Sequence, residues 1–121
     1  MQYSDIANLA KENDYFRKVL FTNSHTQVVL MSLKPGEDIG METHEGNDQI
    51  LYFVDGNGKA IINGEEHSVT AGDLVDVPAG AEHNFINIGD EAMKLFTVYG
   101  PAHHPDGTIH ETKADAEADE A

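Results

Sequence analysis

Three side chains suited to metal binding or proton transfer lie close together within residues 36–56. Glu42 and His44 are two residues apart, so in a β-strand both would point to the same face. The sequence Gly46-Asn47-Asp48 is typical of a turn and can fold the chain back, so that Gln49 faces them from a partner strand. A carboxylate, an imidazole and a carboxamide on one hairpin predict a polar pocket. A fourth group would have to come from elsewhere in the chain.

The elements that must position these groups are mostly short strands. Helical spacing of apolar residues predicts a helix over residues 4–13, with Ser4 as a plausible N-cap. Asn63-Gly64 is the strongest hairpin signal in the chain. Alternating, β-branched and aromatic segments between glycine, proline and asparagine turns predict strands over 15–22, 25–33, 49–54, 59–62, 65–69, 73–77, 83–88 and 92–99. This pattern predicts an all-β fold, a closed β-barrel or jelly roll.

The chain divides into three predicted parts. Residues 1–14 form an N-terminal helical segment, residues 15–99 form the barrel, and residues 100–121 form an extended, acidic tail. From residue 111 onward alanine alternates with acidic residues, which leaves a frayed helix or disorder open for that end.

Composition limits the classes of partner and of site. The 121 residues contain no cysteine, which excludes disulfides and thiolate-bound zinc or iron–sulfur centres. A net charge of −15 disfavours binding to nucleic acid and to anionic membranes. The N-terminal residues lack the basic and apolar parts of a signal peptide, and no apolar run is long enough to span a bilayer, so we expect a cytoplasmic location.

A second ordered motif supplies the missing fourth group. It has glycine, five residues, proline, one residue, glycine, two residues, histidine, three residues and asparagine, and it is matched by Gly72, Pro78, Gly80, His83 and Asn87. His83 would begin a strand and face the first hairpin across a small barrel. The side chain of Asn87 is expected to stabilise the adjoining turn by hydrogen bonds.

With these two segments the chain resembles the cupin superfamily, in particular small single-domain bacterial cupins often compared with mannose-6-phosphate isomerase. Gly36, His44 and Gly56 match the first cupin motif. Glu42 stands where that motif usually has its first histidine, and Gln49 stands where it usually has glutamate. The resemblance covers roughly residues 16–99 and implies the cupin-type β-barrel.

The resemblance also implies one divalent metal ion, bound by Glu42, His44, Gln49 and His83. Two imidazoles and one carboxylate with open positions suit non-haem iron, and manganese, zinc or nickel are alternatives. Gln49 is a weak neutral donor that could instead lie just outside the ligand set. The alternative is that these groups are polar barrel-lining residues hydrogen-bonded around water.

Three further residues are candidates for a substrate pocket. Phe85 shares a strand face with His83, Tyr99 could place a phenol near the metal, and Arg17 is the only arginine in the chain. A phosphorylated substrate normally needs a cationic clamp, so a single arginine and few lysines weigh against a sugar phosphate. His103, His104 and His110 lie in the tail, where they are solvated or, less favoured, fold over the barrel and add a ligand.

Two classes of function remain open from the sequence. One is an enzyme that acts on a small polar sugar- or carbonyl-type substrate by Lewis-acid chemistry, as an isomerase or lyase, or as a dioxygenase if the metal is iron, with Glu42 as a possible proton shuttle. The other is a non-catalytic domain that binds or senses a small molecule. Family analogy implies a homodimer in either case.

Overall fold

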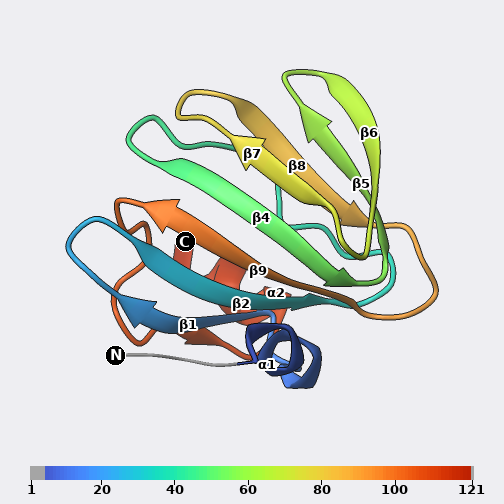
Figure 1. Ribbon diagram of the computed structural model, residues 1–121, viewed down its shortest axis with the longest axis horizontal. Helices are drawn as coiled ribbons and strands as arrows, with labels where there is room; N and C mark the ends of the chain where they lie inside the picture. The colour runs from blue at the N-terminus through green and yellow to red at the C-terminus, as the bar shows by residue number, and fades with distance from the viewer. Residues whose placement is uncertain (1–4, 121) are drawn as a thin grey trace.

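The computed structural model describes residues 5–120, which form two antiparallel β-sheets facing each other (Figure 1). The six-stranded sheet has the order β10-β1-β2-β9-β4-β7, and the four-stranded sheet has the order β3-β8-β5-β6. The strands are β1 (Arg17–Thr22), β2 (Gln27–Leu33), β3 (Glu42–Thr43), β4 (Asp48–Asp55), β5 (Asn57–Ile62), β6 (Glu65–Thr70), β7 (Leu74–Val77), β8 (Glu82–Asn87), β9 (Met93–Gly100) and β10 (Ile109–His110). The predicted all-β jelly-roll barrel is confirmed.

The main hydrophobic core fills the space between the two sheets. Alternation along β9 shows how the strands face it, because Leu95, Thr97 and Tyr99 are buried while Phe96 and Val98 are only partly buried. These three residues therefore share the face of β9 that points into the core. The core cluster contains Phe16, Val19, Val29, Met31, Leu33, Leu51, Phe53, Ala60, Val69, Val77, Ala81, Phe85, Met93, Leu95, Tyr99 and Ala116.

Two turns show why particular residue types are needed at their positions. Asn63 and Gly64 both have positive φ, 49° and 82°, and join β5 to β6 as the hairpin signal predicts. Gly56 has φ 99°, and a Cβ there would lie 2.8 Å from the Cα of Met93. Any side chain at position 56 would therefore clash with the start of β9.

The predicted hairpin carrying Glu42, His44 and Gln49 is wrong in its pairing. β3 pairs with β8, with Glu42 opposite His83, whereas Gln49 in β4 lies opposite Tyr99 and Val77 in the other sheet. The chain before β3 also follows β8, through a bridge between Asp38 and Ile86. The turn at 46–48 therefore carries the chain from one sheet to the other.

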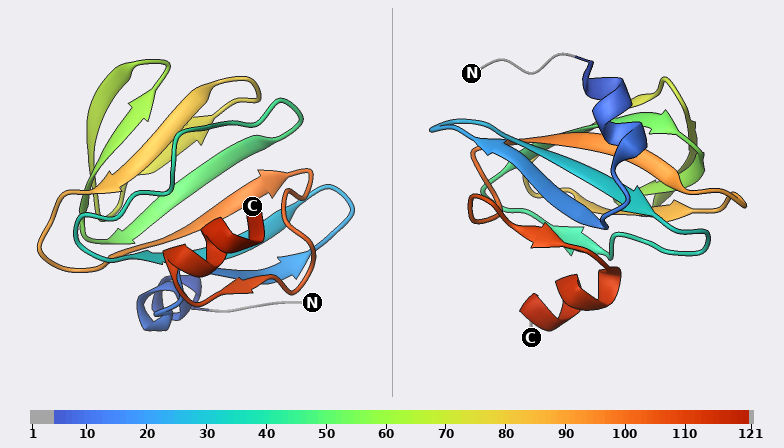
Figure 2. Two further views of the ribbon diagram at one scale, coloured as in Figure 1. Left: turned by 180° about the vertical axis from the view of Figure 1, so that it is seen from behind. Right: turned by 90° about the horizontal axis from the view of Figure 1, so that it is seen from below.

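The two helices lie on opposite sides of the six-stranded sheet (Figure 2). Helix α1 (Ile6–Glu12) packs on the outer face through Ala10, against Leu30 and Val54. The proposed N-cap Ser4 lies outside the described residues. Within those residues, no helix is long and apolar enough to cross a membrane.

Helix α2 (Lys113–Glu120) follows β10 at the C-terminal end, where the sequence left a frayed helix or disorder open. Ala116 is buried and belongs to the main core cluster, and Lys113 forms an ion pair with Asp38. Residues 101–108, here called the connecting segment, link β9 to the short strand β10, which pairs with β1.

Candidate metal centre

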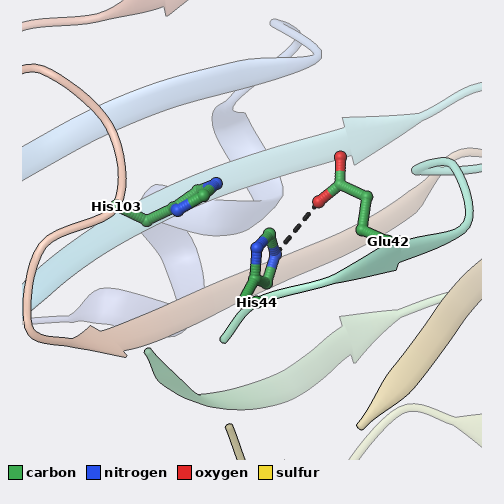
Figure 3. A group of neighbouring side chains, drawn as sticks. All are labelled: Glu42, His44 and His103. Carbon is green, nitrogen blue, oxygen red and sulfur yellow. Dashed lines mark ion pairs between the residues drawn. The ribbon is translucent and has the colours of Figure 1, made fainter. Parts of the chain in front are cut away.

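The centre of the site is the pair Glu42 and His44 (Figure 3). β3 presents Glu42 at the edge of the four-stranded sheet, and His44 follows directly after the strand. Glu42 Oε2 lies 3.0 Å from His44 Nε2, and His44 is buried. Their two-residue spacing predicted that the two side chains point the same way, and the short distance between them agrees with that prediction.

Glu42 Oε2 and His44 Nε2 are close, but their contact is not counted as a hydrogen bond. Within residues 5–120, His44 Nε2 has no partner that meets hydrogen-bond geometry, although the carboxylate oxygen lies 3.0 Å away. Burial acts to raise the pKa of Glu42, but His44 and the charge of Arg17 outweigh it, and the net shift is downward. The carboxylate is therefore ionised and lies beside a buried nitrogen, which is the arrangement that a shared cation would satisfy.

His103 is brought to the same point from the connecting segment. Glu42, His44 and His103 each offer a ligand atom, and these atoms lie within 4.8 Å of one another. The rings of His44 and His103 have centroids 4.1 Å apart. Burial and the neighbouring His44 lower the pKa of His103, so the imidazole is neutral near pH 7 and keeps a lone pair for a metal.

The prediction that His83 faces these groups across the barrel is wrong, because His83 in β8 lies opposite Glu42 on the adjacent strand β3 of the same sheet. The ring centroids of His83 and His44 are 5.1 Å apart. The Nδ1 atom of His83 is 3.0 Å from the carbonyl oxygen of Ala81. A carbonyl can only accept, so Nδ1 carries the proton and Nε2 of the neutral ring keeps the lone pair. Metal-ligating histidines are commonly oriented in this way. His83 is not one of the three residues in the cluster of Glu42, His44 and His103, and its role as a ligand stays a prediction.

Gln49 reaches the site from the opposite sheet. Its Nε2 donates to Thr97 Oγ1 at 3.0 Å and to the Tyr99 hydroxyl at 3.2 Å. Thr97 uses its own proton on the carbonyl of Ile50, so Thr97 must accept from Gln49, which fixes the orientation of the amide. Gln49 Oε1 is buried and has no partner in the part of the chain described. That oxygen is free to bind a metal or a water molecule.

The three pocket candidates lie at different depths. Tyr99 is buried with its ring 6.0 Å from that of His44, and burial raises its pKa, so the phenol keeps its proton. Phe85 is fully buried, 6.1 Å from His83 and 5.7 Å from Phe53, and packs behind the site. Substrate contact by Tyr99 and Phe85 stays a prediction.

Arg17 lines a cavity of about 230 Å³ that also reaches Glu42. The guanidinium is buried, and one terminal nitrogen lies 3.1 Å from His110 Nδ1. Since arginine only donates, His110 must accept at Nδ1, and its Nε2 donates to Asp119 at 2.9 Å. His110 therefore positions Arg17 and is not part of the cluster at Glu42. The remaining lining residues are Phe16, Asp38, Ile39, Gly40, Met41, Lys113, Ala116 and Glu117.

The remaining histidines are distributed as follows. His25 and His67 are exposed and lie apart from the cluster. His104 packs edge-on against Tyr99 at 5.4 Å, and burial lowers its pKa to about 3. Asn87 donates to the carbonyls of Leu33 and Glu91, which confirms its predicted role at the turn.

The donor set fits a divalent metal. Imidazole nitrogens and carboxylate or amide oxygens suit zinc, iron, manganese and nickel. The buried nitrogen of His44 and the buried oxygen of Gln49 are two polar atoms that lack a partner among the described residues. A possible metal site is therefore present, at the place where the two sheets approach each other.

The chain belongs to the cupin family. The profile of the cupin domain matches residues 29–99, which include both motifs, Gly36 to Gly56 and Gly72 to Asn87. The fold described above is that of a small single-domain cupin.

Individual relatives agree with this assignment. The crystal structure of BH2720 from Bacillus halodurans superposes with a TM-score of 0.95 at 39% identity, covering 97% of this chain and 93% of that one. The uncharacterized protein YrkC of Bacillus subtilis is 44% identical over 122 residues, covering 96% of this chain and 66% of its own length. An oxalate-binding protein of Thermotoga maritima is 32% identical over 68 residues, or 56% of each chain. The chain thus spans about two thirds of YrkC.

Proposed function

We propose that this cupin binds one divalent metal ion and acts on a small polar substrate. Glu42 and His44 would hold the metal together with His83. His103 from the connecting segment and Gln49 from the opposite sheet complete the set of available donors. The observation that carries the proposal is the 3.0 Å approach of Glu42 Oε2 to a buried His44 Nε2 that has no hydrogen bond among the described residues.

A bound divalent metal would supply Lewis acidity toward a carbonyl or enediol oxygen of the substrate. Glu42 has a second carboxylate oxygen that can accept a proton from a substrate carbon or hydroxyl. Tyr99 keeps its proton and can act as a hydrogen-bond donor at the same point. This combination supports an isomerase or lyase, and a dioxygenase if the metal is iron.

The cavity beside Glu42 supports the choice of a small substrate. Its volume of about 230 Å³ suits a molecule of a few heavy atoms. Arg17 is the only arginine and lines this cavity, so an anionic group of the substrate would bind there. Phe85 is not among the residues that line this cavity; it packs beside His83 and would support the metal site from behind.

A second candidate is a binding domain without catalysis. It is favoured by the similarity to the Thermotoga maritima protein whose name states oxalate binding. In that case the same metal and Arg17 would hold a small carboxylate and no bond would change. The two candidates separate on turnover: the metal-loaded protein is incubated with oxalate and with small keto- and aldo-sugars, and products are followed by NMR.

The metal proposal is tested by elemental analysis of protein purified without a histidine tag. We expect close to one equivalent of a transition metal per chain in the native protein, and its loss in the double variant His44→Ala/His83→Ala. The matched control is His25→Ala/His67→Ala, which removes two exposed histidines and should retain the metal.

Loose binding by the acidic surface gives a different result. Surface carboxylates would hold metal equally in all three proteins, and salt would displace it. Equal metal content in the native protein and the His44/His83 variant, after dialysis at high salt, would refute the proposal.

A further inference from the structure

Gln27 is a fully buried polar side chain at the start of β2, outside the cluster described above. Its Nε2 donates to Thr22 Oγ1 at 2.9 Å and to the carbonyl oxygen of His104 at 2.7 Å. Its Oε1 accepts from the backbone N–H groups of His103 and His104, at 3.1 and 3.0 Å. Three of its four hydrogen bonds therefore hold the backbone of two consecutive residues in the connecting segment.

The register of the sheet explains where this places the segment. Gln27 lies opposite Tyr99 on the neighbouring strand β9, and Tyr99 lies opposite Gln49 on β4. His103 consequently stacks on the Tyr99 ring, with centroids 5.3 Å apart and planes at 27°. Asn47 provides another attachment by donating to the carbonyl of Pro101 at 2.6 Å.

A histidine in a connecting segment normally has backbone and side-chain freedom that a metal would have to restrict on binding. Here the amide N–H groups on both sides of the His103 carbonyl are hydrogen-bonded to one buried oxygen, and the ring is stacked. The backbone position is therefore fixed before any ligand binds. Such preorganisation raises metal affinity, because less conformational entropy is lost when the histidine binds the metal.

We propose that Gln27 is a positioning residue that presents His103 to the metal centre as a ligand. The inference rests on the proposed function, because it requires that a metal binds at Glu42 and His44. It goes beyond it in naming Gln27 as the residue that holds His103, a donor from outside the two cupin motifs, in position for the metal.

The test is a double-mutant cycle on Zn²⁺ affinity, measured by competition with a chromophoric chelator. We expect His103→Ala to weaken binding by about 10- to 100-fold, and Gln27→Met to weaken it by about 10-fold, the range found when residues supporting a ligand are lost. In the His103→Ala background, Gln27→Met should change the affinity by less than about 2-fold. Additive losses would overturn the positioning role.

Two control variants keep the result interpretable. His104→Ala removes the neighbouring ring but leaves the backbone groups that bond to Gln27, so Zn²⁺ affinity should stay within about 3-fold of the native value. A loss equal to that of His103→Ala would overturn the assignment of His103. If Gln27→Met does not fold, Asn47→Ala releases the segment at Pro101 and should lower affinity only while His103 is present.

A metal-free readout separates this inference from the proposed function. In the apo protein, amide hydrogen exchange at His103 and His104 should be slow, and should become fast in Gln27→Met while the strands stay protected. If Zn²⁺ binding depends on His44 but not on His103, the present inference fails and the proposed function stands. If no His44-dependent binding occurs, the proposed function fails, and the ligand role of His103 fails with it.

Discussion

Replacing Gln49 with glutamate probes the polarity of the site directly. Gln49 is buried, and its amide nitrogen donates to the Thr97 and Tyr99 hydroxyls. A carboxylate at position 49 has no proton to donate, so one of its oxygens would face the Thr97 oxygen, whose proton is directed to the Ile50 carbonyl. We therefore expect Gln49→Glu to destabilise the metal-free protein.

The loss of stability caused by the buried charge in Gln49→Glu has an upper limit, because the new carboxyl group can become protonated. A buried glutamate without a cation has a raised pKa, and neutralising it at pH 7 from an ordinary value near 4.3 costs about 3.7 kcal/mol. The charge therefore destabilises the apo protein by at most about 4 kcal/mol at pH 7. With an unfolding entropy of roughly 2.1 cal/mol/K per residue, this corresponds to a fall in Tm of about 15 °C.

The pH dependence has a definite sign. Because the folded-state pKa of the introduced carboxyl group would be raised, the folded variant binds more protons than the unfolded chain above about pH 4.3. Its stability relative to the native protein should therefore fall as the pH rises, by up to about 1.4 kcal/mol per pH unit, until the pH passes the raised pKa. At about pH 5 the charge-dependent part of the difference should fall to about 1 kcal/mol, because the pH is then within one unit of the ordinary pKa near 4.3 of the unfolded chain.

The assay is urea unfolding of the apo and Zn²⁺-saturated proteins between about pH 5 and 8, the range over which the linkage acts. A metal next to position 49 would pair with the new carboxylate, so Zn²⁺ should stabilise Gln49→Glu more than the native protein. Gln49→Met is the control, since it removes the same hydrogen bonds without adding charge. It should lose about 1–2 kcal/mol at every pH.

Two results would contradict this reasoning. An apo Gln49→Glu variant as stable as Gln49→Met at the alkaline end of the range would mean that water reaches the carboxylate. Equal stabilisation of all three proteins by Zn²⁺ would mean that position 49 does not face the metal.

Three further predictions concern the frame around the site. Asn87→Ala should lower the free energy of unfolding by about 2–3 kcal/mol in urea titrations, because its side chain satisfies three buried or half-buried backbone groups; a loss below about 0.5 kcal/mol would contradict this. The hydrogen bond from Lys113 lowers the pKa of Asp38, so the stability this carboxylate contributes is present above its unfolded pKa of about 3.9 and is lost as the pH falls through the lower folded value. Lys113→Met should therefore reduce the loss of stability measured in urea titrations between about pH 5 and pH 2. The homodimer stays a prediction, and we propose that it forms through Ile50 and Leu74, which are 41% and 64% exposed on neighbouring strands; light scattering should give twice the mass of one chain, and Leu74→Glu should shift it toward one.

The local features of the fold were predictable from the sequence. The hairpin at Asn63-Gly64, the inward face of β9 and the role of Asn87 depend on neighbouring residues or on φ angles that few residue types adopt. The pairing of β3 was not predictable in the same way. A turn signal at 46–48 shows that the chain reverses but not whether it returns to the same sheet, and the partner of Glu42 lies far along the chain, at His83.

The connecting segment shows a second limit. The sequence identified His103 as one of three tail histidines and favoured solvent exposure, and His103 is indeed exposed; what the sequence did not favour is its approach to Glu42 and His44. The position of His103 depends on Gln27, whose side chain bonds to main-chain atoms. Every residue type has these main-chain atoms, so the contact cannot be predicted from the residue types at positions 103 and 104. The available signal was a glutamine at an inward-facing position of a strand, next to apolar residues, since a buried amide must find hydrogen-bond partners.

The exchange of ligand types between positions 42 and 49 follows from their neighbours. At position 49 the adjacent hydroxyl of Thr97 can only accept, so the site needs a donor, and glutamine supplies one where the cupin motif usually has glutamate. At position 42 the neighbours are His44 and the guanidinium of Arg17, which lower the pKa of a carboxylate and would repel a protonated imidazole. Moving the carboxylate to Glu42 therefore keeps the charge of the donor set and places it beside the cavity. The negative charge then lines the same cavity as the only arginine, where a substrate anion would have to compete with it. In the metal-free protein, Glu42→Gln should therefore strengthen binding of a small carboxylate at Arg17, and the same change should weaken metal binding.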